Sequence, residues 1–538
     1  MSPKRILPIA EIVLIVVLAC IPLFFTFPYR LNIFLSWEGA YRLYLGQVPY
    51  RDFGLPVGYM YWVIPAIFFK IFGPQLITLI KAQVFINILA GLSFRSILKS
   101  LSIQPTIRFT SVLLFCISYS FLNYWPWYNH TVIVYELIAL AFVLKYLFGS
   151  GRNLLFVVLA GIFVFFSFFT KQDGGGMAFL LCGALLLYET ISQKKWMAVP
   201  VFVASVLLSG LIMILPFTKY NFGYWFNYGQ PPHSSRISLS EIFSEFFSDS
   251  QWLKFYLFLI GILILARIKA GGKEFFQNKQ QMVFMLLVLG ILAEAAIFQV
   301  TSYVPVDNNI FFHSFAFAFL LYLLFFFLPL RLDSWKLVLI CSLGIMLWWS
   351  QVYWKYIQNF FIKQPVYATT GYGGYQYANE VNRNTYMIEL DTTDIPLSQW
   401  RVPKLKSFQK ILLPNPTVDG IERLMNLEVV KRQKELKVLN MTELTPLAAE
   451  LPFRLETGSY YPLWYHLGVG MFTKETDLFC NRIEDKYYDL VLFEYVPYLN
   501  NFYPYKVRAC LEKNYKKIDS FPAPRKPASH AWIEVYQR

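Results

Sequence analysis

Long apolar runs recur through the first two thirds of the chain, and short polar segments separate them. Each run approaches the roughly 20 residues that a helix needs to cross a bilayer. This pattern predicts an α-helical polytopic membrane protein. The first run is long and ends without a small-residue cleavage site, so we expect it to remain as the first span. The eleven predicted spans are about 6–25, 76–98, 108–123, 131–148, 154–170, 176–192, 196–216, 252–268, 281–300, 310–330 and 335–352.

The apolar segment Tyr59–Phe72 is too short to be a regular span, and we expect it to lie in the membrane interface. The charges support this choice. If the N-terminus is cytoplasmic and this segment does not cross, Lys and Arg gather in the inner loops, while the short outer loops 124–130 and 301–309 hold neither. This is the positive-inside pattern. It predicts a cytoplasmic N-terminus and an extracytoplasmic C-terminus.

The composition becomes more polar from about Tyr353 onward. We therefore expect a membrane domain over 1–352 and a C-terminal soluble α/β extracytoplasmic domain over 353–538. No internal repeat is visible. Short apolar or alternating runs predict strands, and amphipathic runs predict helices. The expected strands are Lys437–Asn440, Asp489–Glu494 and Ala531–Tyr536, and the expected helices are Ile421–Leu436 and Tyr505–Asn514.

Composition narrows the class of protein further. Only 15% of the residues are charged and 56% are hydrophobic, which is unlike a soluble domain. The net charge of +15 comes without a basic stripe on a soluble module, so we expect no nucleic acid as a partner. Cys480 and Cys510 lie in the C-terminal part. They could form a disulfide if that part is outside the cytoplasm, or remain free thiols.

The first external segment, 26–75, carries the most conspicuous polar residues beside the membrane. It contains Glu38 and Asp52, together with Arg42 and Arg51. Polar groups at a membrane are costly to desolvate and often serve a function. Glu38 could act as a catalytic base that takes a proton from an attacking acceptor, with Asp52 contributing. The alternative is a surface glutamate that pairs with Arg42 one helical turn later.

The same segment carries a longer motif. It reads Glu38-Gly39-x-Tyr41, Gly46-x-x-x-Tyr50-x-Asp52-Phe53, Pro56-x-Gly58-Tyr59 and Phe72-Gly73. This motif resembles the first external loop of GT-C-class membrane glycosyltransferases, such as aminoarabinose transferases and protein O-mannosyltransferases. That class usually has a paired acidic motif containing Asp, whereas Trp37 precedes a lone Glu38 here. Glu38 then acts alone, Asp52 shares the role, or catalysis is altered.

The resemblance implies a GT-C-like membrane domain and a specific reaction. A sugar would move from a polyprenyl-phosphate carrier to a cell-envelope glycan, lipid or protein on the outer face of the membrane, with inversion at the anomeric carbon. Basic residues near the outer interface would stabilise the leaving phosphate. We expect Arg42, Arg51, Lys81 and Lys171 to be among these residues, with weak support from the resemblance for Lys81.

Each further candidate also has a plainer interpretation. Lys81 could anchor its span by reaching toward the interface. Lys171 and Asp173 could cap helix ends, although Asp173 could also bind a sugar hydroxyl or a metal ion. The stretch Trp125–His130 could form a stacking wall for a sugar or prenyl chain, with His130 as a polar contact, or it could be an aromatic membrane-interface belt. His233, a further candidate for substrate binding, lies in the long loop 217–251, which could be a mobile lid over the site or a connector. A divalent metal ion is compatible with these residues, but no spacing demands one.

Rival functions remain open at this point. A lipid-linked oligosaccharide polymerase or ligase also combines many spans with a large external loop, although the early acidic segment and the terminal soluble domain argue against it. A non-enzymatic lipid-sugar transporter or flippase would carry charges along its path and often shows repeated halves. A non-catalytic homologue is a third alternative. We expect an integral protein of the inner or plasma membrane that acts as a glycosyltransferase.

Overall fold

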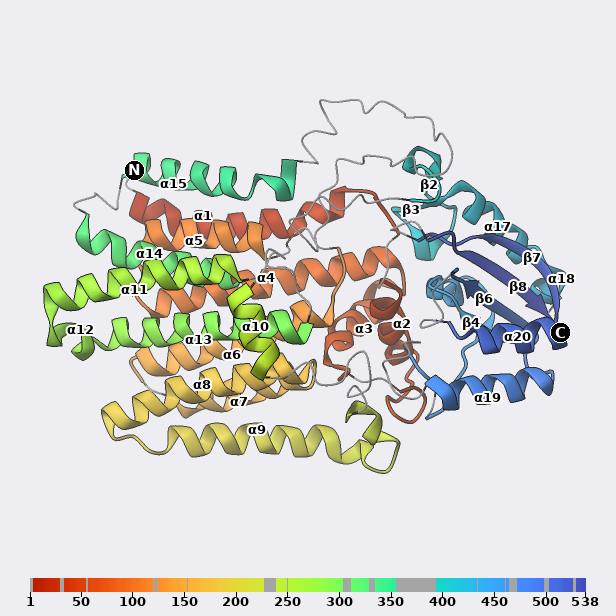
Figure 1. Ribbon diagram of the computed structural model, residues 1–538, viewed down its shortest axis with the longest axis horizontal. Helices are drawn as coiled ribbons and strands as arrows, with labels where there is room; N and C mark the ends of the chain where they lie inside the picture. Colours follow the sequence, from red (N-terminus) through yellow and green to blue (C-terminus); the bar gives the residue numbers. More distant parts are fainter. Residues whose placement is uncertain are drawn as a thin grey trace.

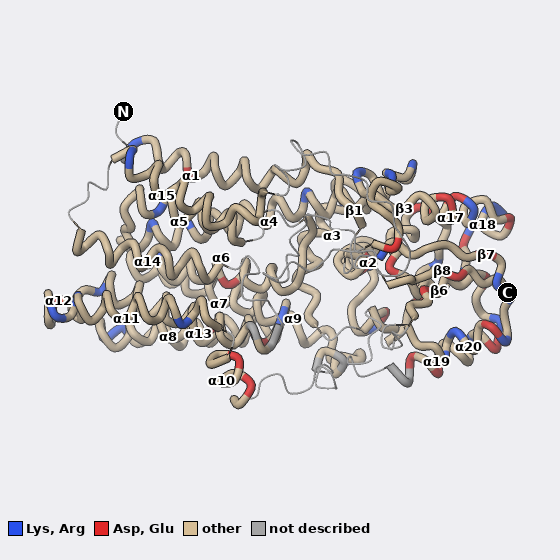
Figure 2. The backbone as a smooth tube through the Cα atoms, turned by 45° about the horizontal axis from the view of Figure 1, so that its top comes forward, with Lys and Arg blue, Asp and Glu red and all other residues tan. Residues whose placement is uncertain are grey.

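The computed structural model has two regions side by side along its long axis, a helical bundle and a smaller domain that contains a β-sheet (Figure 1). Lys, Arg, Asp and Glu are dense on the smaller domain and sparse through the middle of the bundle (Figure 2). The structure describes residues 3–29, 33–54, 57–119, 121, 124–151, 153–226, 239–248, 250–302, 311–328, 334–354, 393–432, 434–459, 461–463, 472–497, 503–525 and 529–538.

The bundle contains a helix at the position of every predicted span. Many apolar side chains remain exposed on its outer helices, as expected for a protein that faces lipid. The chain is an integral membrane protein. The helices of the bundle are α1 (Pro3–Cys20), α4 (Leu76–Ser100), α5 (Pro105–Ser118), α6 (Tyr128–Phe148), α7 (Leu154–Phe168), α8 (Gln172–Gln193), α9 (Ala198–Ile214), α11 (Gln251–Gly271), α13 (Lys279–Ser302), α14 (Phe312–Phe327) and α15 (Trp335–Trp348), with the short α10 (Leu239–Ser248) and α12 (Lys273–Gln277) between them.

Within the described residues, 6 helical segments are both long and apolar enough to cross a bilayer on their own. Helices α5, α7, α14 and α15 are apolar but shorter. The predicted number of spans therefore stays a prediction, although the predicted positions all hold helices. The 6 longer segments are Arg5–Phe24, Leu76–Ser100, Tyr128–Phe148, Gln172–Gln193, Ala198–Phe217 and Lys279–Phe298.

The first external segment folds into two short helices rather than an extended loop. Helix α2 (Ile33–Tyr44) carries Glu38, and α3 (Met60–Phe72) is the predicted short apolar segment. Two glycines of the motif are required by packing. A Cβ atom on Gly39 would lie 2.0 Å from the Trp62 ring, and one on Gly58 would lie 1.5 Å from the Phe169 carbonyl oxygen. These glycines let α2, α3 and the end of α7 approach closely.

The C-terminal domain is built on a mixed five-stranded sheet of order β5-β4-β6-β8-β7. Strand β4 pairs in parallel with β5 and β6, and β8 runs antiparallel to β6 and β7. The strands are β4 (Leu436–Met441), β5 (Phe453–Arg454), β6 (Leu490–Tyr495), β7 (Lys516–Pro522) and β8 (Trp532–Gln537), and the helices are α17 (Asn415–Met425), α18 (Glu428–Arg432), α19 (Phe472–Glu484) and α20 (Tyr505–Asn514).

Most elements predicted for this domain are confirmed. Strands β4, β6 and β8 and helix α20 occupy the predicted segments. The single helix predicted over Ile421–Leu436 is wrong, because α17 ends at Met425 and Leu436 begins β4. Leu436 is fully buried and its N–H donates to the Pro452 carbonyl. The sheet thus takes a residue that local periodicity placed in a helix.

The C-terminal domain is joined to the first external segment by a shared sheet and a shared core. Strand β1 (Phe27–Pro28) pairs in parallel with β3 (Ile411–Pro414), which also pairs with β2 (Trp400–Arg401). The Tyr41 hydroxyl donates to the Ala448 carbonyl at 3.2 Å. One hydrophobic cluster runs from α2 and α3 into the central strands of the domain. The predicted boundary after residue 352 adjoins 355–392, which lie outside the described residues.

Candidate active site

Glu38 lies on the side of α2 that faces the interior, and only 7% of its surface is exposed. Arg42 follows one helical turn later and donates from Nε at 2.9 Å and from Nη2 at 2.8 Å to the same oxygen, Oε1 of Glu38. Burial raises the pKa of the Glu38 carboxyl, while the charge and the hydrogen bonds of Arg42 oppose that rise. The net direction is upward, toward the range in which a carboxylate can accept a proton at neutral pH.

Arg42 is fully buried and contacts more than Glu38. Its Nη1 donates to Oε1 of Gln47 and to the backbone carbonyl of Glu456, each at 2.9 Å. Its guanidinium carbon also lies 4.6 Å from the centre of the Tyr461 ring. The predicted pairing of Glu38 with Arg42 is therefore present, but inside the protein rather than on its surface.

Asp52 lies in the turn that follows α2. Its Oδ2 accepts from the Val48 N–H at 2.7 Å and from Nη2 of Arg51 at 2.7 Å. The hydrogen bond from Arg51 lowers the pKa of the Asp52 carboxyl, and the Val48 N–H acts in the same direction. Glu38 and Asp52 thus occupy opposite electrostatic environments. Asp52 is held ionised in a turn, and its depressed pKa makes it the weaker base.

The remaining predicted site residues lie at the starts of three bundle helices. Lys81 is near the start of α4, with Nζ 4.3 Å from the centre of the Phe72 ring. His130 is in the first turn of α6, and its carbonyl accepts from the Tyr119 hydroxyl at 2.5 Å. Lys171 precedes α8 and its Nζ donates to Oδ2 of Asp173 at 2.8 Å. His233 lies outside the described residues.

Two hydrogen bonds and a ring contact connect these helix starts with α2 and α3. Trp37 on α2 donates to the Pro74 carbonyl just before α4, at 3.1 Å. Ser36 on α2 donates to the Pro126 carbonyl just before α6, at 2.5 Å. The Tyr59 ring lies edge-on to Phe169, just before Lys171, with centres 4.9 Å apart. The predicted residues that the structure describes therefore lie at one end of the bundle, around the first external segment.

No group of three His, Cys, Asp or Glu side chains within the described part of the chain is placed to hold a metal ion. The two C-terminal cysteines are joined. Cys480 on α19 and Cys510 on α20 form a disulfide with their Cα atoms 5.6 Å apart. This is one of the two alternatives that the sequence left open.

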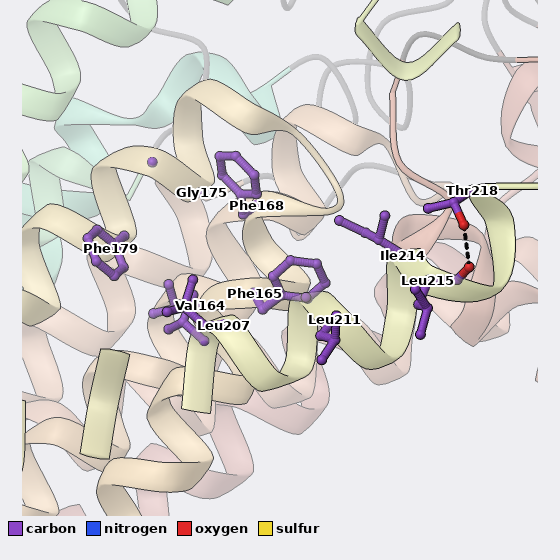
Figure 3. A pocket seen from close by; sticks show the side chains of 13 residues that line it. Val164, Phe165, Phe168, Gly175, Phe179, Leu207, Leu211, Ile214, Leu215 and Thr218 are labelled. Carbon is purple, nitrogen blue, oxygen red and sulfur yellow. Dashed lines mark hydrogen bonds between the residues drawn. The ribbon is translucent and has the colours of Figure 1, made fainter. Parts of the chain in front are cut away.

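An apolar cavity of about 580 Å³ lies between α7, α8 and α9 (Figure 3). Phe165, Phe168 and Leu211 contribute to its walls, and Thr218 is at one end. A Cβ atom on Gly176, which also lines the cavity, would meet no atom within 4 Å. This cavity was not predicted from the sequence, although the small residues Gly174–Gly176 at the start of α8 could have indicated it.

The end of the cavity at Thr218 adjoins a pair of cations. Lys219 follows Thr218, and its Nζ lies 5.1 Å from the centre of the Tyr220 ring. Arg51 approaches the same ring at 6.0 Å. The next residue, Asn221, donates from its backbone N–H to the Tyr50 carbonyl at 3.3 Å. The cavity and the turn that holds Asp52 are thus neighbours, and Lys219 is a site candidate that the sequence analysis did not single out.

No protein-family model matches the chain, and no curated protein sequence matches it. Two solved structures of ArnT from Cupriavidus metallidurans are similar to it. The apo structure aligns over 66% of this chain and 65% of that chain, with a TM-score of 0.38 and 13% identity. The structure bound to undecaprenyl phosphate aligns over 98% of this chain and 97% of that chain, with a TM-score of 0.46 and 10% identity.

The apo match spans just under two thirds of the length of that ArnT chain. At these identities and TM-scores the likeness concerns the fold alone, and the role of each residue has to come from this chain's own geometry. The chain is similar in its fold to these ArnT structures, and it has many apolar helices and a C-terminal domain that contains strands.

Proposed function

We propose that the protein is a membrane glycosyltransferase that moves a sugar from a polyprenyl-phosphate carrier to a cell-envelope acceptor on the outer face of the membrane. The observation that carries this proposal is the environment of Glu38. A buried carboxyl with a raised pKa, held by one arginine at the membrane end of the molecule, suits a general base.

The roles of the two carboxylates follow from their surroundings. Glu38 takes the proton from an acceptor hydroxyl or amine as that group attacks the anomeric carbon of the sugar. The bond from the anomeric carbon to the carrier oxygen breaks, and the carrier leaves as polyprenyl phosphate. Asp52 has a lowered pKa and holds its turn, so we assign it a supporting place beside the reacting groups.

The candidate donor site combines the apolar cavity with positively charged side chains. The apolar cavity between α7, α8 and α9 suits part of a prenyl chain. Arg51 and Lys219, at its Thr218 end, are placed to attract a phosphate. Lys171, between the cavity-lining helices α7 and α8, is a further cation and is paired with Asp173. Such groups stabilise the negative charge that develops on the leaving phosphate.

Two observations support an extracytoplasmic site. The disulfide between Cys480 and Cys510 suits an oxidising compartment. Lys and Arg also mark the end of the bundle opposite the C-terminal domain, near α12 and the N-terminus, as the positive-inside rule expects of a cytoplasmic end (Figure 2). The N-terminus would then be cytoplasmic, and the candidate active site would face outward with the C-terminal domain.

The test is sugar transfer in reconstituted vesicles. A panel of polyprenyl-phosphate sugars is offered to wild type, to Glu38→Gln and to the matched control Asp52→Asn, and mass spectrometry follows donor consumption. We expect wild type to consume one donor, Glu38→Gln to lose most of that activity, and Asp52→Asn to keep more of it. Equal consumption by wild type and Glu38→Gln would remove Glu38 as the base.

A second candidate function, a lipid-sugar transporter, is favoured by one specific observation. Glu136 on α6 and Glu294 on α13 are both buried in the bundle and interact with each other. Acidic groups inside a membrane often mark a path for ions or substrates. Measuring flipping of the same lipids separates the two functions. Flipping without donor consumption would favour the transporter.

A further inference from the structure

We infer that the segment 456–463 of the C-terminal domain holds Arg42 against Glu38, so that this domain builds one wall of the candidate active site. Tyr461 is then a positioning residue that acts through Arg42. The catalytic meaning of this inference rests on the proposed function. The contacts that carry it come from residues 456–459 and 461–463 and do not depend on that function.

Hydrogen bonds and an aromatic ring hold Arg42 in place. Two of its hydrogen bonds end on Glu38, and a third ends on Gln47 in the same external segment. A fourth, at 2.9 Å, ends on the backbone carbonyl of Glu456 in the C-terminal domain. The Tyr461 ring covers the guanidinium at 4.6 Å, closer than the Phe53 ring at 5.5 Å. A buried guanidinium keeps its orientation only where such contacts fix it.

Backbone hydrogen bonds join the segment to the turn that follows α2, next to Arg42. The Gly458 N–H donates to the Asp52 carbonyl at 2.8 Å. The Gly54 N–H donates to the Tyr461 carbonyl at 2.7 Å, and the Leu463 N–H donates back to the Gly54 carbonyl at 3.0 Å. These backbone hydrogen bonds fix the register between the segment and the turn that holds Asp52. The register places the Tyr461 ring on Arg42.

The segment is also anchored within the C-terminal domain, on helix α19. Arg482 on α19 forms an ion pair with the Glu456 side chain, whose carbonyl receives the Arg42 hydrogen bond. The Tyr461 ring packs edge-on against Phe479 of the same helix, with centres 6.3 Å apart. The disulfide between Cys480 and Cys510 ties α19 to α20. The segment therefore transmits the position of a rigid helix to Arg42.

The consequence for Glu38 is electrostatic. Arg42 is the group that opposes the effect of burial on the Glu38 carboxyl, so a loosened Arg42 should let the Glu38 pKa rise further. Nearby groups that also act on this network are Tyr29, Asp52 through Arg42, and the pair of Glu456 and Arg482. Glu456 and Arg482, like Tyr461, lie in the C-terminal domain and can be changed without altering α2 or its turn.

The experiment compares Tyr461→Leu, which removes the ring, with Tyr461→Phe, which keeps it. The full-length protein in vesicles is treated with a hydrophobic carbodiimide, which reacts with protonated carboxyl groups, across a range of pH. Mass spectrometry of the Glu38 peptide gives the pH of half-maximal labelling. We expect Tyr461→Leu to raise this midpoint by about half a pH unit or more, and Tyr461→Phe to match wild type.

The acid limb of kcat/KM for sugar transfer should move by the same amount, which a purely structural role for Tyr461 would not cause. A Tyr461→Leu protein that melts at a lower temperature but labels with the wild-type midpoint would overturn the inference. If wild type transfers no sugar and the labelling midpoints still differ, the proposed function fails and the positioning role stands. If Tyr461→Leu does not fold, Arg482→Gln loosens the Glu456 anchor, and the same upward shift is expected.

Discussion

Two buried glutamates, one on a bundle helix and one on the first external segment, have different surroundings. Glu11 on α1 receives Nε of Arg95 on one oxygen at 2.7 Å and Nε of Arg108 on the other at 2.8 Å. Glu38 on α2 receives a single arginine, through two hydrogen bonds to one oxygen. The two arginines make Glu11 part of an ion-pair cluster that joins α1, α4 and α5. Glu38 is held by a single arginine, and burial raises the pKa of its carboxyl, so Glu38 has the surroundings of a base while Glu11 has those of a structural residue.

The largest expected effect is at Glu38. Glu38→Gln keeps the shape and an oxygen for Arg42 but cannot accept a proton, so we expect sugar transfer to fall by about 10²- to 10⁴-fold. The melting temperature should fall less than in Glu11→Gln, because one buried arginine loses its charge partner here rather than two. Donor consumption and thermal unfolding in detergent measure the two quantities. A large loss of stability with full residual activity per folded molecule would reverse the comparison.

The matching change at Glu11 should show the opposite pattern of activity and stability. Glu11→Gln leaves two arginines without their shared carboxylate, and breaking such a buried pair costs about 3–5 kcal/mol. We therefore expect a strongly lowered melting temperature, with transfer per folded molecule close to that of wild type. A stable Glu11→Gln protein with reduced transfer would show that the inner cluster takes part in function.

Variants in the apolar cavity test whether this end of the bundle binds the lipid donor, without a change to any charged residue. Gly176→Leu places a side chain into open space that lines the cavity, whereas Gly183→Leu fills open space on the same helix at a residue outside the cavity lining. We expect Gly176→Leu to raise KM for the lipid donor by roughly tenfold and Gly183→Leu to leave it unchanged. Equal KM values in the two variants would place the prenyl chain elsewhere.

A pH test concerns the C-terminal domain at its contact with the first external segment. Burial raises the pKa of the Glu443 carboxyl to about 8, with Arg525 opposing and Glu494 adding to the rise. Because the folded state holds this proton more tightly than the unfolded chain, its contribution to stability is complete below the usual carboxyl range. That contribution is lost as the pH rises toward about 8.

Glu443→Gln, which needs no proton, should therefore flatten the fall in melting temperature between pH 5 and about 8. Wild type and variant should melt at similar temperatures at the acid end and diverge at the alkaline end, with the variant the more stable. Parallel curves across this range would mean that Glu443 does not titrate in the folded protein.

The smallest effect is expected at Arg51, which is largely exposed. Solvent screens its ion pair with Asp52, so Arg51→Ala should barely change the melting temperature. If Arg51 attracts the donor phosphate, KM for the donor should rise a few-fold, and the rise should shrink at high salt. A KM equal to that of wild type at low salt would remove Arg51 from the donor site.

The sequence could predict elements whose signals are local. Apolar runs of sufficient length located the bundle helices, and the motif residues located the segment that forms α2 and α3. Helix α20 was predicted over its full length. The prediction failed over Ile421–Leu436, where the helical period continued into a strand that pairs with two others. Strand pairing is a non-local contact, and periodicity within one segment cannot reveal it.

The candidate site likewise has one feature that local sequence determines and several that tertiary contacts determine. The pairing of Glu38 with Arg42 follows from helical spacing, so the sequence determined it once α2 formed. The burial of that pair and the Tyr461 ring over Arg42 depend on contacts between segments hundreds of residues apart. The apolar cavity depends on how the three successive helices α7, α8 and α9 pack together. Membrane insertion and helix spacing are properties of short stretches of chain and can be read from them. The electrostatic environment of Glu38 depends on what excludes water around it, and only the tertiary structure decides that.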